Sequence, residues 1–195
     1  MKKLLFLLIW LPQLLIAQEI KSITSDEWNQ LVDYLDQEQW EEASKTSFGY
    51  LNRLSKEEQE LDQAAMLRYM YLLSQSGMMN DRKLSKDEAF KNVKEFKGKT
   101  LILPGHPLET KQGFNVIHPA NNRADTLMIT QSNHKATNIL CFEYVILEKK
   151  LTMAEFEMLK GKIGRVKGKL KSIHVHGNFL PRFQLFITKA TMEVE

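Results

Sequence analysis

The chain has 195 residues, 43% of them hydrophobic and 26% charged, and its formal net charge at pH 7 is +3. This length allows one medium domain or two small ones. A charge so close to neutral gives no global reason to expect nucleic acid or an anionic membrane as partner. Cys141 is the sole cysteine, so no disulfide can form within the chain. Its apolar neighbours predict a buried, unreactive thiol.

The first eighteen residues have the three parts of a bacterial secretory signal. Two lysines precede an uninterrupted apolar run at 4–11, and the small residue Ala17 follows a second apolar stretch. Pro12 breaks the run, which is shorter than the roughly 20 residues of a membrane-spanning helix. We therefore expect residues 1–18 to be a signal peptide cleaved near Ala17 or Gln18. The mature protein should be exported, periplasmic or extracellular, without a transmembrane segment and with its charge lowered from +3 to +1 by the loss of the two lysines.

From Ser25 to Phe96, apolar residues recur at the spacing of amphipathic helices. Ser55 can cap the third helical segment, and a glutamate three residues later would complete a capping box. The centre of that segment is apolar on nearly all sides, which predicts a helix buried between neighbours. Gly77 is expected to end it. The expected helices begin near Ser25, Trp40, Lys56 and Lys86.

This helical region, residues 19–96, resembles a tetratricopeptide repeat. When Trp28 is aligned with the leading tryptophan of the repeat, Leu31, Leu35 and Phe48 fall on its apolar positions. The resemblance implies antiparallel helical hairpins. Stacked repeats need about three units to be stable alone, and this region has room for about one and a half. We therefore expect it to pack on the rest of the chain.

From Lys97 onward the pattern changes to that of β-strands. A turn composition, Ser132 to Lys135, separates two of the strongest apolar runs. Thr152 and Glu155 form a capping box at the start of a short helix. The expected strands lie at 99–103 with 114–117, 126–131, 137–147, 163–175 and 182–194, and the helix precedes the last two. This is the element order of an OB barrel.

The end of the chain carries a sharper resemblance. The segments 164–173, 180–182 and 185–190 resemble the closing strands of tRNA-anti-like OB domains, with a glycine where the strands bend and alternating apolar positions. The resemblance implies an OB-fold domain at 97–195, a five-stranded barrel with one short helix. The fold class is therefore α+β. Since the motif is structural, it predicts the fold rather than a ligand.

The third expected strand bears on the choice of ligand. We interpret its alternation as turning Phe142 and Tyr144 into the core, with Glu143 on the opposite face. The second and third strands together hold a single cation, Lys135, in the turn between them. OB domains that bind single-stranded nucleic acid present stacked aromatic side chains beside cations. On this interpretation, nucleic acid is not favoured as a partner.

Four cations alternate with smaller or apolar residues on the expected fourth strand: Arg165, Lys167, Lys169 and Lys171. Alternation places them on one face at a spacing of about 6.6 Å. They are the candidate site for a polyanion, such as an acidic polysaccharide, a lipid headgroup or an acidic protein surface. The alternative is a solvated outer face, since edge strands favour lysine as a protection against aggregation.

Two histidines on the same strand, His174 and His176, form a weak candidate metal site, because alternation would present both imidazoles on one side. A third ligand could come from His106, His118, Asp125 or Glu143 only through a contact made by the fold, so we expect neither a metal nor another cofactor. Signatures of nucleophilic hydrolases, zinc proteases, phosphate-binding loops and redox pairs are absent from the sequence. We therefore do not expect an enzyme.

These observations predict a non-catalytic, exported interaction or adaptor module of the cell envelope that recognises a protein or a polymer. The first alternative is an OB-fold protein that binds a polyanion or an oligonucleotide through the cations of the fourth strand. The second is a small hydrolase whose site is assembled from scattered residues. A deep pocket with convergent ionisable groups would favour that hydrolase.

Overall fold

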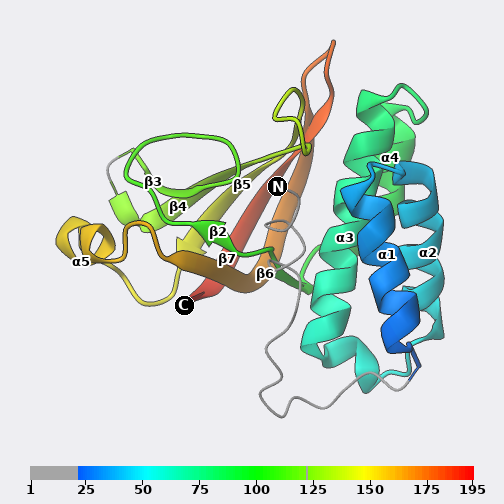
Figure 1. The fold of residues 1–195 in the computed structure, drawn as a ribbon, viewed down its shortest axis with the longest axis horizontal. Helices are drawn as coiled ribbons and strands as arrows, with labels where there is room; N and C mark the ends of the chain where they lie inside the picture. Colours follow the sequence, from blue (N-terminus) through cyan, green and yellow to red (C-terminus); the bar gives the residue numbers. More distant parts are fainter. Residues whose placement is uncertain (1–21, 122) are drawn as a thin grey trace, which may run out of the picture.

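The computed structural model describes residues 22–121 and 123–195. The predicted signal peptide, residues 1–18, lies outside them. The fold is α+β, as predicted, with five α-helices and one seven-stranded mixed sheet in the described residues. Helices α1 to α4 lie together on one side of the sheet, and the short helix α5 lies at its far end (Figure 1).

The helical region contains α1 (Ser25–Asp36), α2 (Trp40–Arg53), α3 (Asp62–Asn80) and α4 (Lys86–Val93), with short 3-10 turns at Glu58–Glu60 and Lys94–Phe96. Local chemistry sets the start of two of these helices. Ser85 caps α4 through a capping box with Glu88. The cap of α1 is Thr24, whereas the sequence favoured Ser25 or Asp26, because the glutamate that completes a capping box, Glu27, lies three residues after Thr24.

The boundaries of α3 differ from the prediction at both ends. The capping box of Ser55 and Glu58 is present, but it holds the 3-10 turn, and α3 begins only at Asp62. Gly77 does not end the helix, which continues to Asn80. A Cβ atom at Gly77 would lie 2.2 Å from the ring of Trp40, so this glycine permits close packing of α2 on α3.

The strands are β1 (Thr100–Ile102), β2 (His106–Pro107), β3 (Ile117–Ala120), β4 (Arg123–Ser132), β5 (Ile139–Leu147), β6 (Ile163–His176) and β7 (Arg182–Val194). Their order is β1-β6-β7-β5-β4-β3, with β2 also paired to β6. Only the β5–β7 pair is parallel among the strand pairs described. Helix α5 (Met153–Met158) connects β5 to β6, and its capping box of Thr152 and Glu155 confirms the predicted helix start.

The predicted five-stranded barrel is not confirmed, because the sheet has seven strands and is not closed. The expected first strand is divided into β1, β2 and β3. Pro104 cannot donate a hydrogen bond to a strand ladder, and it separates β1 from β2. An isolated bridge between Leu108 and Ile117 connects the end of β2 to β3.

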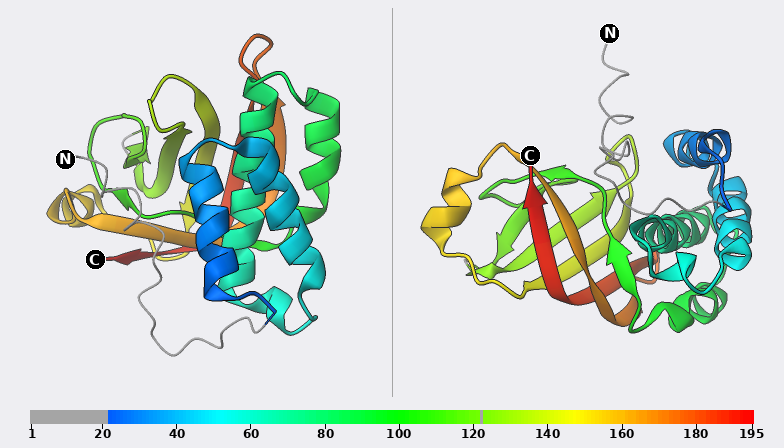
Figure 2. Two further views of the ribbon diagram at one scale, coloured as in Figure 1. Left: turned by 45° about the vertical axis from the view of Figure 1, so that its right-hand side comes forward. Right: turned by 90° about the horizontal axis from the view of Figure 1, so that it is seen from below.

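Helix α3 connects the helical region to the sheet. It lies between helices α1 and α2 and the strands (Figure 2), while α4 contacts β6 directly, and it is buried along most of its length. The Tyr69 hydroxyl donates a 2.6 Å hydrogen bond to the Glu143 carboxylate of β5, and the Ser76 hydroxyl donates to the Leu140 carbonyl. One continuous hydrophobic core includes residues of both regions. The expectation that the helices pack on the rest of the chain is confirmed.

The predicted orientation of β5 is wrong. Glu143 is fully buried with Cys141 and Val145, whereas Phe142 and Tyr144 are on the outer face, where Ile146 is 49% exposed. Apolar residues occupy both faces of this strand, so alternation alone cannot say which face is inside. Helix α3 decides which face of β5 is buried, because the Tyr69 hydroxyl donates the hydrogen bond that allows the Glu143 carboxyl group to lie in the core.

Candidate functional site

The outer side of β5, β7 and β6 carries a cluster of rings, which we call the aromatic face: Phe142, Tyr144, His174 and Phe186. The parallel register places Tyr144 beside Phe186, and their rings stack with centroids 5.1 Å apart and planes inclined by 12°. The His174 ring meets Phe186 edge-on at 5.7 Å. These contacts hold the rings in one arrangement before any ligand arrives.

A shallow groove of about 270 Å³ runs over the aromatic face. Ile146 and Thr126 lie along it on one side, and the exposed Lys171 lies on the other. At the opposite end, the Arg182 guanidinium stacks over the Phe142 ring, 4.9 Å from its centroid. The aromatic face therefore offers apolar rings with two cations beside them, Lys171 next to the groove and Arg182 over Phe142.

The four predicted cations all lie on β6. Lys167, Lys169 and Lys171 are exposed, and Arg165 is partly buried. The pairing of β6 with β7 shifts register between Lys167 and Lys169 and again between Leu170 and Ser172, so the row is not evenly spaced as predicted. Lys167 forms a 2.7 Å ion pair with Asp62 of α3. Lys169 and Lys171 are the cations nearest along the strand to the aromatic face.

The alternative explanation of these cations, a solvated outer face, also agrees with the exposure of Lys167, Lys169 and Lys171. β6 pairs with β7 on one side, and on the other side its ladders with β2 and β1 end at Lys169. Lys171 lies beyond these ladders, where a lysine can protect a strand edge.

His174 and His176 are both exposed, as alternation predicts. His174 packs against Phe186 of the aromatic face. Within residues 22–121 and 123–195, no group of three or more histidine, cysteine or acidic side chains could hold a metal ion. The structure therefore brings no third ligand to the two histidines among these residues.

The carboxyl group of Glu143 is buried beneath the sheet, although the sequence predicted it on the face opposite the core. Desolvation raises the pKa of Glu143 to about 8, against the smaller opposing effect of the Tyr69 hydrogen bond. Its Oε2 atom has no hydrogen-bond partner in the described structure. Burial also raises the pKa of Cys141 well above its usual range. The buried, unreactive thiol predicted for Cys141 agrees with this environment.

A second buried polar group is His106 on β2. Its Nε2 atom lies 2.8 Å from Oε1 of Gln131, whose amide nitrogen donates to Asn115 Oδ1 at 3.1 Å. Desolvation lowers the pKa of His106 to about 4, so the imidazole is neutral in the folded protein at pH 7. This network ties the loop before β3 to β4. Sequence reasoning named His106 only as a possible metal ligand and did not predict this network, because its three residues are far apart in the chain.

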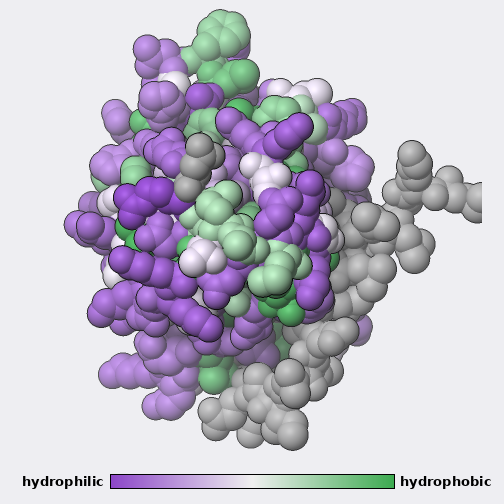
Figure 3. Space-filling view, turned by 90° about the vertical axis from the view of Figure 1, so that its left-hand side faces the viewer, coloured by the Kyte–Doolittle hydropathy of each residue, from purple (hydrophilic) through white to green (hydrophobic). Residues whose placement is uncertain are grey.

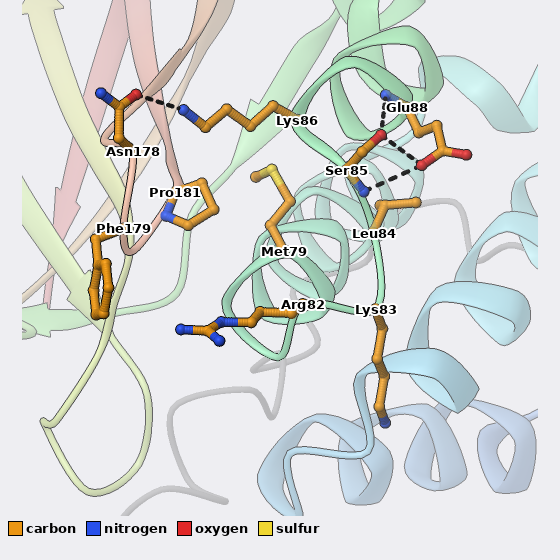
Figure 4. Close-up of a pocket in the computed structure, with 10 residues that line it drawn as sticks. All are labelled: Met79, Arg82, Lys83, Leu84, Ser85, Lys86, Glu88, Asn178, Phe179 and Pro181. Carbon is orange, nitrogen blue, oxygen red and sulfur yellow. Dashed lines mark hydrogen bonds between the residues drawn. The ribbon is translucent and has the colours of Figure 1, made fainter.

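A larger groove of about 540 Å³ lies where the α3–α4 connection faces the loop between β6 and β7 (Figure 4). We call it the junction groove. Lys86 donates a 2.9 Å hydrogen bond across it to Asn178, and Arg82 points toward the ring of Phe179. Its lining comes from segments almost a hundred residues apart, so no local sequence pattern reveals it. The lining residues are Met79, Arg82, Lys83, Leu84, Ser85, Lys86, Glu88, Asn178, Phe179 and Pro181.

The end of the molecule that carries α5 shows a hydrophobic patch framed by hydrophilic residues (Figure 3). Helix α5 contributes Met153, 38% exposed, and Met158, 73% exposed. Singly exposed methionines are common on protein surfaces. Nothing around them indicates a specific ligand.

Comparison of the chain with models of protein families, with curated proteins and with solved structures finds no match. None of the helices in the described part of the chain is long and apolar enough to cross a membrane. The candidate sites therefore rest on the geometry of this structure.

Proposed function

We propose that the protein is an exported, non-catalytic binding module of the cell envelope, made of a tetratricopeptide-like helical region at 19–96 and an OB-type domain at 97–195. The OB assignment is supported by the parallel β5–β7 pair, the antiparallel pairs on either side of it, and a helix between β5 and β6. The antiparallel neighbours α1 and α2, joined by three residues, support the helical assignment.

The aromatic face with Lys169 and Lys171 is the proposed binding surface, and its partner is a polymer of ring-shaped units that carry negative charge. One observation carries the proposal: stacked rings and exposed cations share an outer sheet face. Ring edges and faces contact the flat surfaces of sugars or bases, while lysines contact the anionic groups. An acidic polysaccharide of the envelope has this chemistry.

The second candidate partner is a single-stranded oligonucleotide. The outward position of Phe142 and Tyr144 favours it, because aromatic side chains beside cations are the usual surface for stacking successive bases. The sequence argument against nucleic acid had two grounds: that these two rings face the core, which is wrong, and that the two strands hold a single cation, Lys135, which still applies.

The proposal is non-catalytic because the two groups with strongly shifted pKa values that would suit acid–base chemistry, Glu143 and His106, are both enclosed. A general acid or base must reach the proton that it transfers. The aromatic face itself is lined by rings, hydroxyls, aliphatic chains and Lys171, with no carboxylate among them. No cofactor is needed for binding of this kind.

The test is to measure binding of the mature protein to polygalacturonate, heparin and oligo-dT at about 50 mM and about 200 mM salt. We expect salt-sensitive binding that falls at least about tenfold in the pair Tyr144→Ala with Phe186→Ala, and in the pair Lys169→Gln with Lys171→Gln. The matched control replaces two exposed lysines of the helical region, Lys56 and Lys94, with glutamine. Tighter binding of oligo-dT than of both polysaccharides would select the second candidate.

Absence of binding to all three polymers, or equal binding by the wild type and the Tyr144→Ala, Phe186→Ala protein, would refute the assignment of this face. Circular dichroism of each variant would show whether the fold is intact. The lysine replacements are at exposed positions, where substitutions usually change stability by less than about 0.5 kcal/mol each.

A further inference from the structure

We propose that the junction groove is a second binding surface, separate from the aromatic face, and that it takes an acidic peptide segment of a partner protein with an apolar side chain among its carboxylates. The groove lies between the α3–α4 connection and the β6–β7 loop, and Figure 4 shows its walls. This inference does not depend on the polymer bound elsewhere.

The charge of the groove favours an anionic occupant. Arg82, Lys83 and Lys86 line it, and Glu88 is the single carboxylate among its lining residues. That carboxylate is already engaged, since Glu88 accepts hydrogen bonds from the Ser85 N–H and the Ser85 hydroxyl in the capping box of α4. Arg82 forms no ion pair within the described residues, whereas Lys83 points away from the hairpin wall and its charge acts on Glu41 of α2. A segment with carboxylates would supply the missing counter-charges.

The apolar part of the groove favours a peptide over other polyanions. Phe179 is 80% exposed, and Met79, Leu84 and Pro181 lie along the same groove. Nucleic acid would need several rings to stack its bases, and the groove has one. Polysaccharides lack the aliphatic side chains that would fill the space between Met79 and Phe179. Aromatic and arginine side chains, by contrast, are enriched where protein interfaces gain most of their affinity.

The walls of the groove are arranged before binding. The hydrogen bond from Lys86 to Asn178 fixes the distance between the helical and hairpin walls. The Arg82 guanidinium lies 5.6 Å from the centroid of the Phe179 ring. A ligand that meets an arranged site loses less free energy to ordering than one that must assemble it.

The backbone at Arg82 adds a separate observation. Its φ angle is +59°, and the Lys83 N–H donates to the Met78 carbonyl, which is the pattern that ends many helices with a glycine at this position. Arginine adopts this left-handed conformation less readily than glycine. This helix end places the Arg82 guanidinium beside the Phe179 ring.

The experiment selects peptides from a random heptapeptide library displayed on phage, with the mature wild-type protein as bait. We expect the enriched peptides to contain several aspartates or glutamates beside a leucine, methionine or aromatic residue. A synthetic copy of the most enriched peptide should bind at least about tenfold more weakly to Arg82→Gln and to Phe179→Ala. Lys91→Gln, a change of an exposed lysine on α4 outside the groove, should bind like the wild type.

Three results would overturn the inference: no enriched peptide, enriched peptides without an acidic excess, or equal affinity for the wild type and both groove variants. Two results together would assign the peptide to the aromatic face instead. Heparin or oligo-dT would displace the peptide from the wild type, and the Arg82→Gln variant would still bind these polymers. Arg82 and Phe179 are exposed, so thermal unfolding of the variants provides the check that the fold is intact. Polymer binding by both variants should be unchanged, which keeps this test distinct from that of the proposed function.

Discussion

At the scale of single residues, two buried ionisable groups oppose each other in their effect on stability. The pKa of Glu143 is raised by burial from 4.5 to about 8, so its contribution is fully present below pH 4.5 and is lost as the pH rises through 8. The pKa of His106 is lowered by burial from 6.5 to about 4, so its contribution is present above pH 6.5 and is lost as the pH falls through 4. Between pH 4.5 and 6.5 the two slopes cancel.

We therefore expect the free energy of unfolding to be nearly flat between pH 4.5 and 6.5 and to fall between pH 6.5 and 8. The slope in the upper range should be on the order of 1.4 kcal/mol per pH unit, because one proton separates the folded and unfolded states. Urea unfolding at a series of pH values measures it. Glu143→Gln should abolish the fall above pH 6.5 and leave the rise due to His106 below it.

The companion variant is His106→Gln, which removes the opposing slope. Its free energy of unfolding should decline across the whole range from pH 4.5 to 8. Identical pH profiles for the wild type and Glu143→Gln would show that the carboxyl group does not titrate inside the sheet. The exposed carboxylates with lowered pKa values, such as Glu27 and Glu41, titrate at pH 4.5 or below in both states, so they affect only the acid edge of this range.

At the scale of elements, the packing of α2 on α3 depends on a missing side chain. Trp40 is buried, and its ring occupies the space where a Cβ atom of residue 77 would be. Glycine lowers the intrinsic stability of a helix by about 1 kcal/mol relative to alanine. The contact with Trp40 evidently outweighs that cost, since α3 continues through Gly77 for three further residues.

A pair of glycine replacements tests this packing. Gly77→Ala should destabilise the protein by about 1–3 kcal/mol, because the added methyl group forces Trp40 to move within a filled core. Gly49→Ala is the matched control, since Gly49 is exposed inside α2 with no atom within 4 Å of its added Cβ. It should stabilise by up to about 1 kcal/mol. Thermal unfolding of both variants shows whether each change raises or lowers the stability. A stabilised Gly77→Ala protein would disprove the role of Gly77 in the packing of α2 on α3.

At the scale of the whole molecule, the helical region and the sheet complete one another. Tyr69 is fully buried and reaches Glu143 within the sheet, and the Arg68 guanidinium donates to the carbonyl oxygen of Thr100 at 3.2 Å. The loop between β4 and β5 is held as well, because the His134 N–H donates to the Glu38 carboxylate at 3.0 Å. Removing either region would uncover core side chains and leave Glu143 without its donor.

We expect neither 19–96 nor 97–195 to unfold cooperatively when expressed separately, while 19–195 shows a single transition. Each fragment would expose the apolar surface that α3 shares with the sheet, and its remaining core would be too small to compensate. Differential scanning calorimetry of the three proteins measures the transitions. A cooperative transition in the isolated 97–195 fragment would show that the sheet is an independent domain.

The features that could be predicted from the sequence were those that depend on residues close together in the chain. The capping boxes at Ser85 and Thr152, the turn after β4 and the outward positions of Lys167 and Lys169 follow from patterns a few residues long. The end of α3 was mispredicted at Gly77, because the signal for a helix end was local and the packing partner, Trp40, lies in another helix.

The candidate sites were only partly predictable. The sequence contains the cations of β6, but the aromatic face and the junction groove each combine side chains from separate strands or helices. The orientation of β5 decides whether Phe142 and Tyr144 are core or binding surface. An alternating pattern with apolar residues on both faces is compatible with either, so the orientation could not be derived from it.

The sequence by itself determined the α+β class, most element positions and the helical region's need for a partner, because local capping, turn chemistry and hydrophobic period act over short distances. Only the tertiary structure decided which face of β5 is buried, where the sheet remains open and how α3 packs against it. Those outcomes depend on contacts between residues far apart in the chain, such as Tyr69 with Glu143, and their free energy exists only when both partners are in place.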